Sequence, residues 1–79
     1  SQNLPNPFTT ATSFAYNTAN LGRGMVKVYR ANGKVVFSQS VKGSGVITWK
    51  AAEQLSAGVY FYRLTSGNLV VSKRMILVR

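Results

Sequence analysis

The sequence contains no cysteine, no histidine and a single acidic residue, Glu53, among its 79 residues. Without cysteine no disulfide can stabilise the fold. Without histidine or a group of carboxylates, no cluster of side chains can hold zinc, calcium or iron. Proton transfer near neutral pH usually needs a histidine or two carboxylates with different pKa values. We therefore expect no metal or other cofactor, no catalytic residue and no enzymatic activity.

Long apolar runs are also absent. No run approaches the roughly 20 residues that a membrane-spanning helix needs, and the first residues lack the charged and apolar regions of a secretory signal peptide. We expect no membrane span, and if the parent protein is secreted, its signal peptide lies upstream. A chain of this length forms one domain, residues 1–79, and buries only about 60 to 65% of its unfolded surface. The apolar core alone must stabilise it.

The ten Lys and Arg residues give a net charge of +9. Such a charge could attract nucleic acid, acidic glycans or an anionic membrane surface. However, residues 1–22 carry no charge, and the cations then appear singly from Arg23 to Arg79, with only Lys73 and Arg74 adjacent. This spread indicates solvated strand faces and weak non-specific attraction, so we do not expect a nucleic-acid partner.

Short segments with strand-like alternation follow one another at roughly ten-residue spacing. Residues 1–9 form an extended lead-in, because prolines favour extended conformations in the residues before them. Strands are expected over Thr10–Tyr16, Met25–Arg30, the apolar run that starts at Val35, Val46–Lys50, Gly58–Thr65 and Leu69–Val78. Trp49 is expected to lie in the core, and Ala51–Ala57 is too short for a stable helix. The pattern predicts an all-β fold, an immunoglobulin-like antiparallel β-sandwich of six to seven strands.

The hairpin turn at Asn32 and Gly33 is the strongest local signal, since both residues tolerate a positive φ. Its register stays open. A two-residue loop would pair Val28 with Phe37, whereas a three-residue loop with Gly33 in a bulge would pair Val28 with Val36. A slip of one residue exchanges the faces of a strand.

The segment Gly58–Tyr62 is similar to the tyrosine corner of immunoglobulin-like sandwiches, in which a tyrosine near the start of a late strand donates a hydrogen bond to upstream backbone. Tyr60 would be the corner residue. In the alternative interpretation, Tyr60 and Tyr62 are ordinary core aromatics, and the sandwich prediction is unaffected.

Four motifs follow one another along the chain. They are Leu4-Pro5-Asn6-Pro7-Phe8 before a Thr-rich strand, Val28-Tyr29 before Asn32-Gly33-Lys34, Leu55-Ser56-Ala57-Gly58-Val59-Tyr60-Phe61-Tyr62-Arg63-Leu64, and Lys73-Arg74-Met75-Ile76-Leu77-Val78-Arg79. In this order they resemble a known family, the C-terminal sorting domains of proteins exported by the type IX (Por) secretion system of Bacteroidetes-type bacteria. One departure is that the acidic residue often found before the hairpin turn is Arg30 or Ala31 here.

The resemblance implies a sorting signal that directs an upstream cargo domain through the periplasm and outer membrane to the cell surface or the medium. Outer-membrane translocon components would recognise it, and a surface sortase would cut it off in or before the lead-in. The residues that carry the signal would be Pro5, Asn6, Pro7, Gly58, Tyr60, Lys73, Arg74, Leu77 and Arg79.

The last strand is apolar on both faces, although a strand at the end of a chain usually lies at a sheet edge. An edge offers unpaired backbone groups, so we expect a protein partner to add a strand to it, with Lys73, Arg74 and Arg79 attracting that partner. The alternative is that the sheet and the lead-in bury both faces of the strand.

The main rival function is a generic immunoglobulin-like or fibronectin-like spacer or carbohydrate-binding module, with Tyr29, Phe37 or Phe61 stacking on sugars. A sugar-binding site usually needs a flat aromatic platform, and Phe61 beside Val59 and Arg63 makes a poor one. A weaker rival is single-stranded nucleic-acid binding driven by charge.

Overall fold

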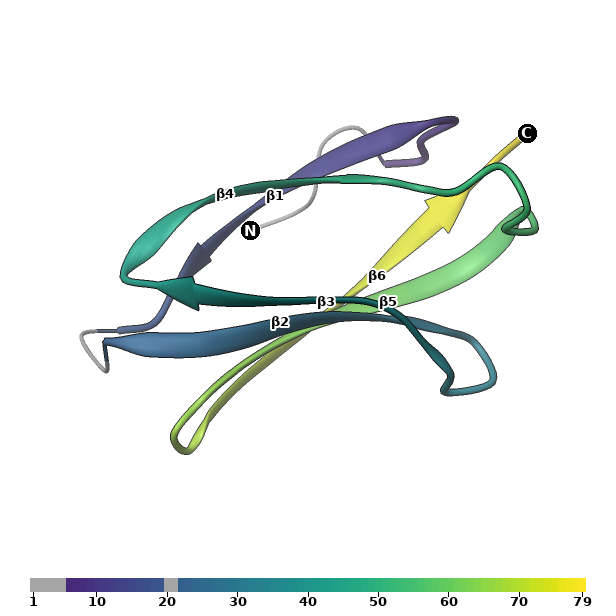
Figure 1. The fold of residues 1–79 in the computed structure, drawn as a ribbon. Coiled ribbons are helices and arrows are strands. Elements are labelled where there is room, and N and C mark those ends of the chain that lie inside the picture. Colours follow the sequence, from purple (N-terminus) through teal and green to yellow (C-terminus); the bar gives the residue numbers. More distant parts are fainter. Residues whose placement is uncertain (1–5, 20–21) are drawn as a thin grey trace.

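A computed structural model describes residues 6–19 and 22–79 and contains six antiparallel strands in two layers (Figure 1). The strands are β1 (Ala11–Asn17), β2 (Arg23–Arg30), β3 (Val35–Lys42), β4 (Ser44–Lys50), β5 (Gly58–Ser66) and β6 (Leu69–Leu77). One sheet has the order β3-β2-β5-β6, and β1 and β4 form the other. The described residues contain no helix. The predicted all-β sandwich is confirmed, with six strands.

The two layers form because the strands alternate apolar and polar residues. Side chains point to opposite faces in turn, so every second residue of a strand faces the other sheet. In β5 the buried residues are Tyr60, Tyr62 and Leu64, while Val59, Phe61 and Arg63 are exposed. The predicted inward faces of β1, β2 and β4 are likewise buried at Thr12, Phe14, Val26, Val28, Ile47 and Trp49.

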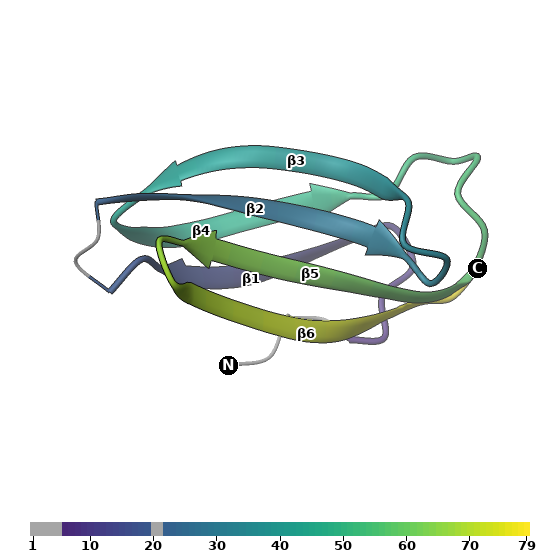
Figure 2. The same ribbon diagram turned by 90° about the horizontal axis from the view of Figure 1, so that it is seen from below.

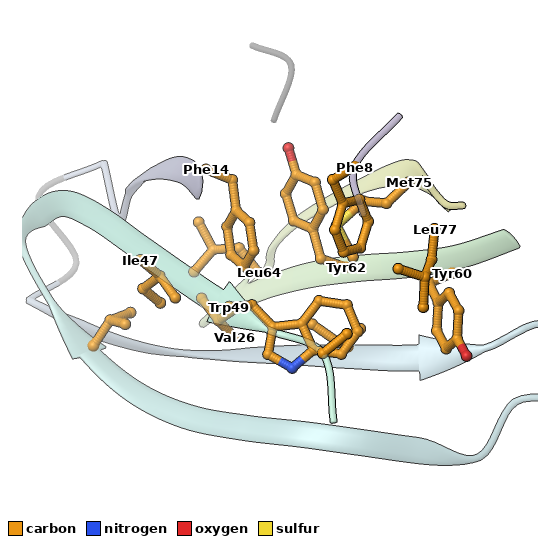
Figure 3. Packing of buried hydrophobic residues seen from close by; sticks show 13 residues of the cluster. Phe8, Phe14, Val26, Ile47, Trp49, Tyr60, Tyr62, Leu64, Met75 and Leu77 are labelled. Atoms are coloured by element: carbon orange, nitrogen blue, oxygen red, sulfur yellow. The ribbon is translucent and has the colours of Figure 1, made fainter. Parts of the chain in front are cut away.

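Aromatic rings fill the space between the sheets (Figure 3). Phe14 of β1 stacks on Tyr62 of β5 with ring centroids 4.3 Å apart. Trp49 of β4 meets Phe8 and Tyr60, each at 5.8 Å, and Phe37 at 6.5 Å. Trp49 therefore contacts the lead-in and both layers, which confirms its predicted place in the core.

The β2–β3 hairpin combines parts of the two predicted registers. Arg30 and Lys34 enclose a three-residue loop, with Gly33 at a φ of 91° and its N–H donating to the Arg30 carbonyl. Nevertheless Val28 pairs with Phe37, because a second bulge shifts the register between Val28 and Tyr29. Val36 is the extra residue of this bulge, so Val35 and Phe37 lie on opposite faces of the sheet. Val35 is exposed, whereas Phe37 is half-buried against Trp49.

The strands extend further than the sequence pattern suggested. β3 runs to Lys42 and β4 begins at Ser44, so the turn between them is reduced to Gly43, whose φ is 61°. β2 begins at Arg23 rather than Met25. Residues 51–57 contain a turn closed by the Leu55 N–H donating to the Ala52 carbonyl at 3.0 Å, as expected of a segment too short to form a helix.

Candidate functional site at the last strand

β6 lies at the edge of the four-stranded sheet and pairs with β5 on one side only (Figure 2). Its two halves differ on the other side. We call Leu69–Lys73 the open half and Arg74–Leu77 the sealed half, because the described lead-in residues Asn6 and Phe8 form hydrogen bonds with the backbone at the second segment and none is shown with the first. Most of the predicted signal residues lie in or around the sealed half.

Phe8 joins the lead-in to the sealed half. It forms a parallel bridge with Leu77, in which the Phe8 N–H donates to the Ile76 carbonyl at 3.0 Å and the Val78 N–H donates to the Phe8 carbonyl at 2.8 Å. The Phe8 side chain is 1% exposed and packs edge-on against Trp49. The first and last motifs of the sequence are therefore bound to each other.

Asn6 continues this pairing with its side chain instead of its backbone. Its Oδ1 accepts a hydrogen bond from the Ile76 N–H at 2.9 Å, and its Nδ2 donates to the Arg74 carbonyl at 3.4 Å. The amide thereby occupies the place of a peptide group of a neighbouring strand. Pro7 is exposed, and the bond that precedes it is cis. Pro5 lies outside the described residues.

Tyr60 and Gly58 hold the start of β5 beside the sealed half. The Tyr60 hydroxyl donates to the Ser56 carbonyl, four residues upstream, at 2.7 Å, which is the hydrogen bond predicted for the tyrosine corner. Gly58 pairs with Leu77 at a φ of 149°, where a residue with a Cβ is strained. Leu77 itself is buried at 1% exposure.

The outer backbone edge of the open half has no partner among the described strands. Arg74, Ile76 and Val78 direct their backbone groups toward the lead-in. Because these directions alternate along a strand, the N–H and C=O groups of Val70 and Ser72 point the same way, and no described strand pairs with them there. The Val70 side chain is 58% exposed, so the interpretation in which both faces of the last strand are buried is wrong.

A groove of about 480 Å³ runs between the two sheets beside the open half. It is lined by residues of five strands, among them Phe14, Tyr16, Leu64 and Val71. The two-stranded layer is too narrow to cover the whole four-stranded sheet, and the groove is the uncovered part of the core. An extended segment that paired with the open half would lie next to these apolar side chains.

The three predicted cations are not brought together on one surface. Lys73 and Arg74 are neighbours on a strand and therefore point to opposite faces: Lys73 lies on the inward face and is half-buried, whereas Arg74 is exposed on the outer face. Arg79 lies beyond the end of β6, where its Nη2 donates to the Ala52 carbonyl at 2.8 Å. Only Arg74 is fully available next to the backbone edge.

Reasoning from the sequence missed two features of this region. Phe8 belongs to the first motif but was not chosen as a site residue, although its burial could be suspected from an aromatic residue in an uncharged segment. The role of the Asn6 amide has no counterpart in a hydrophobic pattern.

In the part of the chain that the structure describes, no helix is long and apolar enough to cross a membrane.

Comparison with known proteins gives one result. A search of the curated proteins finds no match. A family model described as a secretion system C-terminal sorting domain matches residues 4–78, nearly the whole chain. Such a domain is the signal of a cargo protein that is exported to the cell surface or medium, and the family is not an enzyme family. The chain therefore belongs to the C-terminal sorting domains of the type IX secretion system.

Proposed function

We propose that outer-membrane translocon components recognise this domain by adding a strand to the open half of β6, while the upstream cargo follows through the periplasm and outer membrane. The observation that carries the proposal is the contrast within one strand: Asn6 and Phe8 form hydrogen bonds with Arg74, Ile76 and Val78, and no described strand lies beside the outward backbone groups of Val70 and Ser72. Unpaired edges are the usual template for strand addition.

The chemistry around the open half fits a strand as the ligand. Backbone hydrogen bonds to Val70 and Ser72 would supply affinity, and every second side chain of the added strand would point toward the groove lined by Phe14, Leu64 and Val71. Arg74 is exposed beside this edge, and the chain has a single acidic residue, Glu53. Acidic side chains on the partner would therefore meet little electrostatic repulsion.

We further propose that the sortase cuts before Asn6. Proteases need a segment of backbone that can enter their cleft. Asn6 and Phe8 are bound to β6 by four hydrogen bonds, two from each residue. Cleavage upstream of Asn6 leaves these contacts intact, so the released domain would keep its fold.

The test is export of a reporter fused upstream of residues 1–79 in a strain with a working type IX system. In Ser72→Pro, the ring removes an N–H that points away from β5, so the pairing of β5 with β6 is preserved. If a strand is added at this position, surface reporter falls by on the order of tenfold, since a hydrogen bond is lost and the ring obstructs the incoming backbone.

Two variants control this experiment. Ser40 lies on the other edge strand, β3, where Gln39 faces its partner Val26 and the Ser40 N–H faces away from β2. Ser40→Pro therefore makes the same change at an edge for which no role is proposed. Ser72→Ala keeps the N–H and removes the hydroxyl that accepts a hydrogen bond from Arg63 at 3.3 Å. Normal export of Ser72→Pro, with unfolding unchanged, would exclude strand addition.

A double variant tests the two cations. Lys73→Ala with Arg74→Ala removes the charges beside the edge without altering the backbone. If they attract the partner, export slows while circular dichroism and thermal unfolding stay as in the parent. Unchanged export would leave strand addition in place and remove the attraction from the proposal.

A further inference from the structure

The outer face of the four-stranded sheet, turned toward the viewer in Figure 2, is not covered by any described element. Six large hydrophobic residues are exposed in the described chain, and four of them belong to this face: Val35 at 42%, Val59 at 38%, Phe61 at 39% and Val70 at 58%. Their clustering is what sets this surface apart, because single exposed hydrophobic residues are normal whereas a contiguous patch marks an interaction site.

The strand pairing places aromatic and basic residues in neighbouring rows on this face. In one row Tyr29 pairs with Phe61, which pairs with Arg74. In the next row Lys27 pairs with Arg63, which pairs with Ser72. Paired residues on one face are in contact distance across the strands. We call the set Lys27, Tyr29, Val35, Val59, Phe61, Arg63, Val70 and Arg74 the outer patch.

Arg63 connects the two rows. Its guanidinium carbon lies 5.4 Å from the centroid of the Tyr29 ring, and its Nε donates to the Ser72 hydroxyl at 3.3 Å. The cation is thus held over the aromatic row instead of extending into water. Arginine and tyrosine fixed in this way are the residue types that contribute most to binding between proteins.

From these observations we infer that the outer patch docks on an acidic surface of a second protein through the side chains of the outer face, next to the strand-addition edge, with which it shares Val70 and Arg74. The patch has three cations around an apolar centre and no carboxylate, because the only acid of the chain, Glu53, lies in the loop after β4. Carboxylates of a partner would therefore pair with Lys27, Arg63 and Arg74 while valine and aromatic side chains are covered. Its role in export rests on the proposed sorting function.

Three other occupants fit less well. A second copy of the chain would bring cations against cations in a symmetric contact. A sugar would need an aromatic platform, but Phe37 points inward onto Trp49, and the patch has no amide or carboxylate. Anionic membranes attract clusters of about four to eight cations, more than the three found here.

The first test uses the reporter fusion with charge reversals in matched pairs. Lys27→Glu with Arg63→Glu changes the patch. Lys42→Glu with Lys50→Glu makes the same charge change at the far end of β3 and on the two-stranded layer. We expect export to fall at least about tenfold in the first pair and to stay near the parent value in the second, as expected when like charges face each other in a contact.

A second pair avoids any effect of charge on folding. Phe61→Thr removes an aromatic ring from the patch and keeps a residue that favours strands, and Val78→Thr replaces another exposed hydrophobic side chain, outside both the patch and the groove. Thermal unfolding of the purified chain verifies that each variant is folded. Export should fall in Phe61→Thr alone.

Photocrosslinking identifies the class of partner. A benzoylphenylalanine at position 61 should crosslink a protein through an acidic region in the exporting strain, and the same probe at position 50, an exposed position of β4, should not. Binding of the purified chain to phosphatidylglycerol vesicles, lost in Lys27→Glu with Arg63→Glu, would overturn the inference in favour of a membrane. Normal export of both patch variants would also overturn it. Failure of the parent fusion to be exported would instead refute the sorting function.

Discussion

The two halves of β6 belong to one strand and pair with the same neighbour, yet they differ in every other contact. In the sealed half, Met75 and Leu77 are buried, and the lead-in occupies the free edge through Asn6 and Phe8. In the open half, Val70 is largely exposed and no described strand lies along its outer backbone edge. The sealed half contributes to stability, and the open half is where we propose that a partner binds. A motif at the end of a chain can therefore serve two purposes that separate within a few residues.

The largest expected effect of a single change is at Phe8. Phe8→Ala removes a ring that is buried between Trp49 and the sealed half, and should lower the free energy of unfolding by about 3–5 kcal/mol. For a domain this small, such a loss would leave much of the population unfolded. Guanidinium unfolding measures it, with Val46→Ala as an exposed control. A loss below about 1 kcal/mol would contradict a structural role for the lead-in.

The next effect is at Asn6. Asn6→Ala deletes both hydrogen bonds of the amide to β6 and leaves the Ile76 N–H without that partner, which should cost about 1–3 kcal/mol. Ser72→Ala, in the open half, should change the free energy of unfolding by less than about 0.5 kcal/mol. Hydrogen exchange at the Ile76 amide gives a local measurement. If the two variants were equally stable, the two halves would not differ as described.

Tyr60→Phe tests the corner. The hydroxyl forms one hydrogen bond, to the Ser56 carbonyl, and its removal should cost about 0.5–1.5 kcal/mol. Tyr29→Phe makes the same change on the outer face and should have a smaller effect on thermal unfolding. Equal effects would show that the corner hydrogen bond adds nothing specific to the sealed half.

Tyr62 pairs with Lys73, where the two halves meet, and gives a dependence on pH. Burial raises the pKa of Tyr62 above its ordinary value of about 10. Above that pH the unfolded chain loses the phenolic proton while the folded chain keeps it, so stability is intact below pH 10 and falls as pH approaches the raised pKa. Unfolding at about pH 9 and about pH 11 should show this loss, and Tyr62→Phe should reduce the slope.

The smallest effect is expected in the open half itself. Val70→Ala shortens an exposed side chain at an edge and should alter the free energy of unfolding by less than about 0.5 kcal/mol. Differential scanning calorimetry is sensitive enough to measure this. A large destabilisation would mean that the open half is part of the core, and the contrast with Phe8→Ala would disappear.

The sequence alone predicted the layers but not the junction between its ends. The alternation of apolar and polar residues identified the buried faces at Phe14, Ile47 and Tyr62, because every second side chain of a strand points to the same face of the sheet. It could not choose the register at Val28, because a bulge adds a residue without leaving any mark in a continuous apolar run. It could not detect the Asn6 amide taking the place of a peptide group, because that contact depends on three-dimensional position rather than on polarity.

The sequence led to the last strand as the candidate site but not to the arrangement of its residues. The prediction that this strand lies at a sheet edge is confirmed. Its cations were expected to act together, yet strand geometry separates Lys73 from Arg74, and the Arg79 guanidinium contacts the loop after β4. The outer patch was not foreseen, since its rows consist of residues more than thirty positions apart, such as Tyr29 and Phe61, that only the pairing of β2 with β5 brings together.

The hydrogen bonds of Asn6 join positions 68 and 70 residues apart, so they can form only after nearly the whole domain has been synthesised. A chain released from the ribosome before Ile76 would contain Asn6 without its hydrogen-bond partner. Such a truncated product would still carry the protein upstream of the domain, but the sorting domain could not complete its fold. A complete fold therefore reports that translation has passed Ile76.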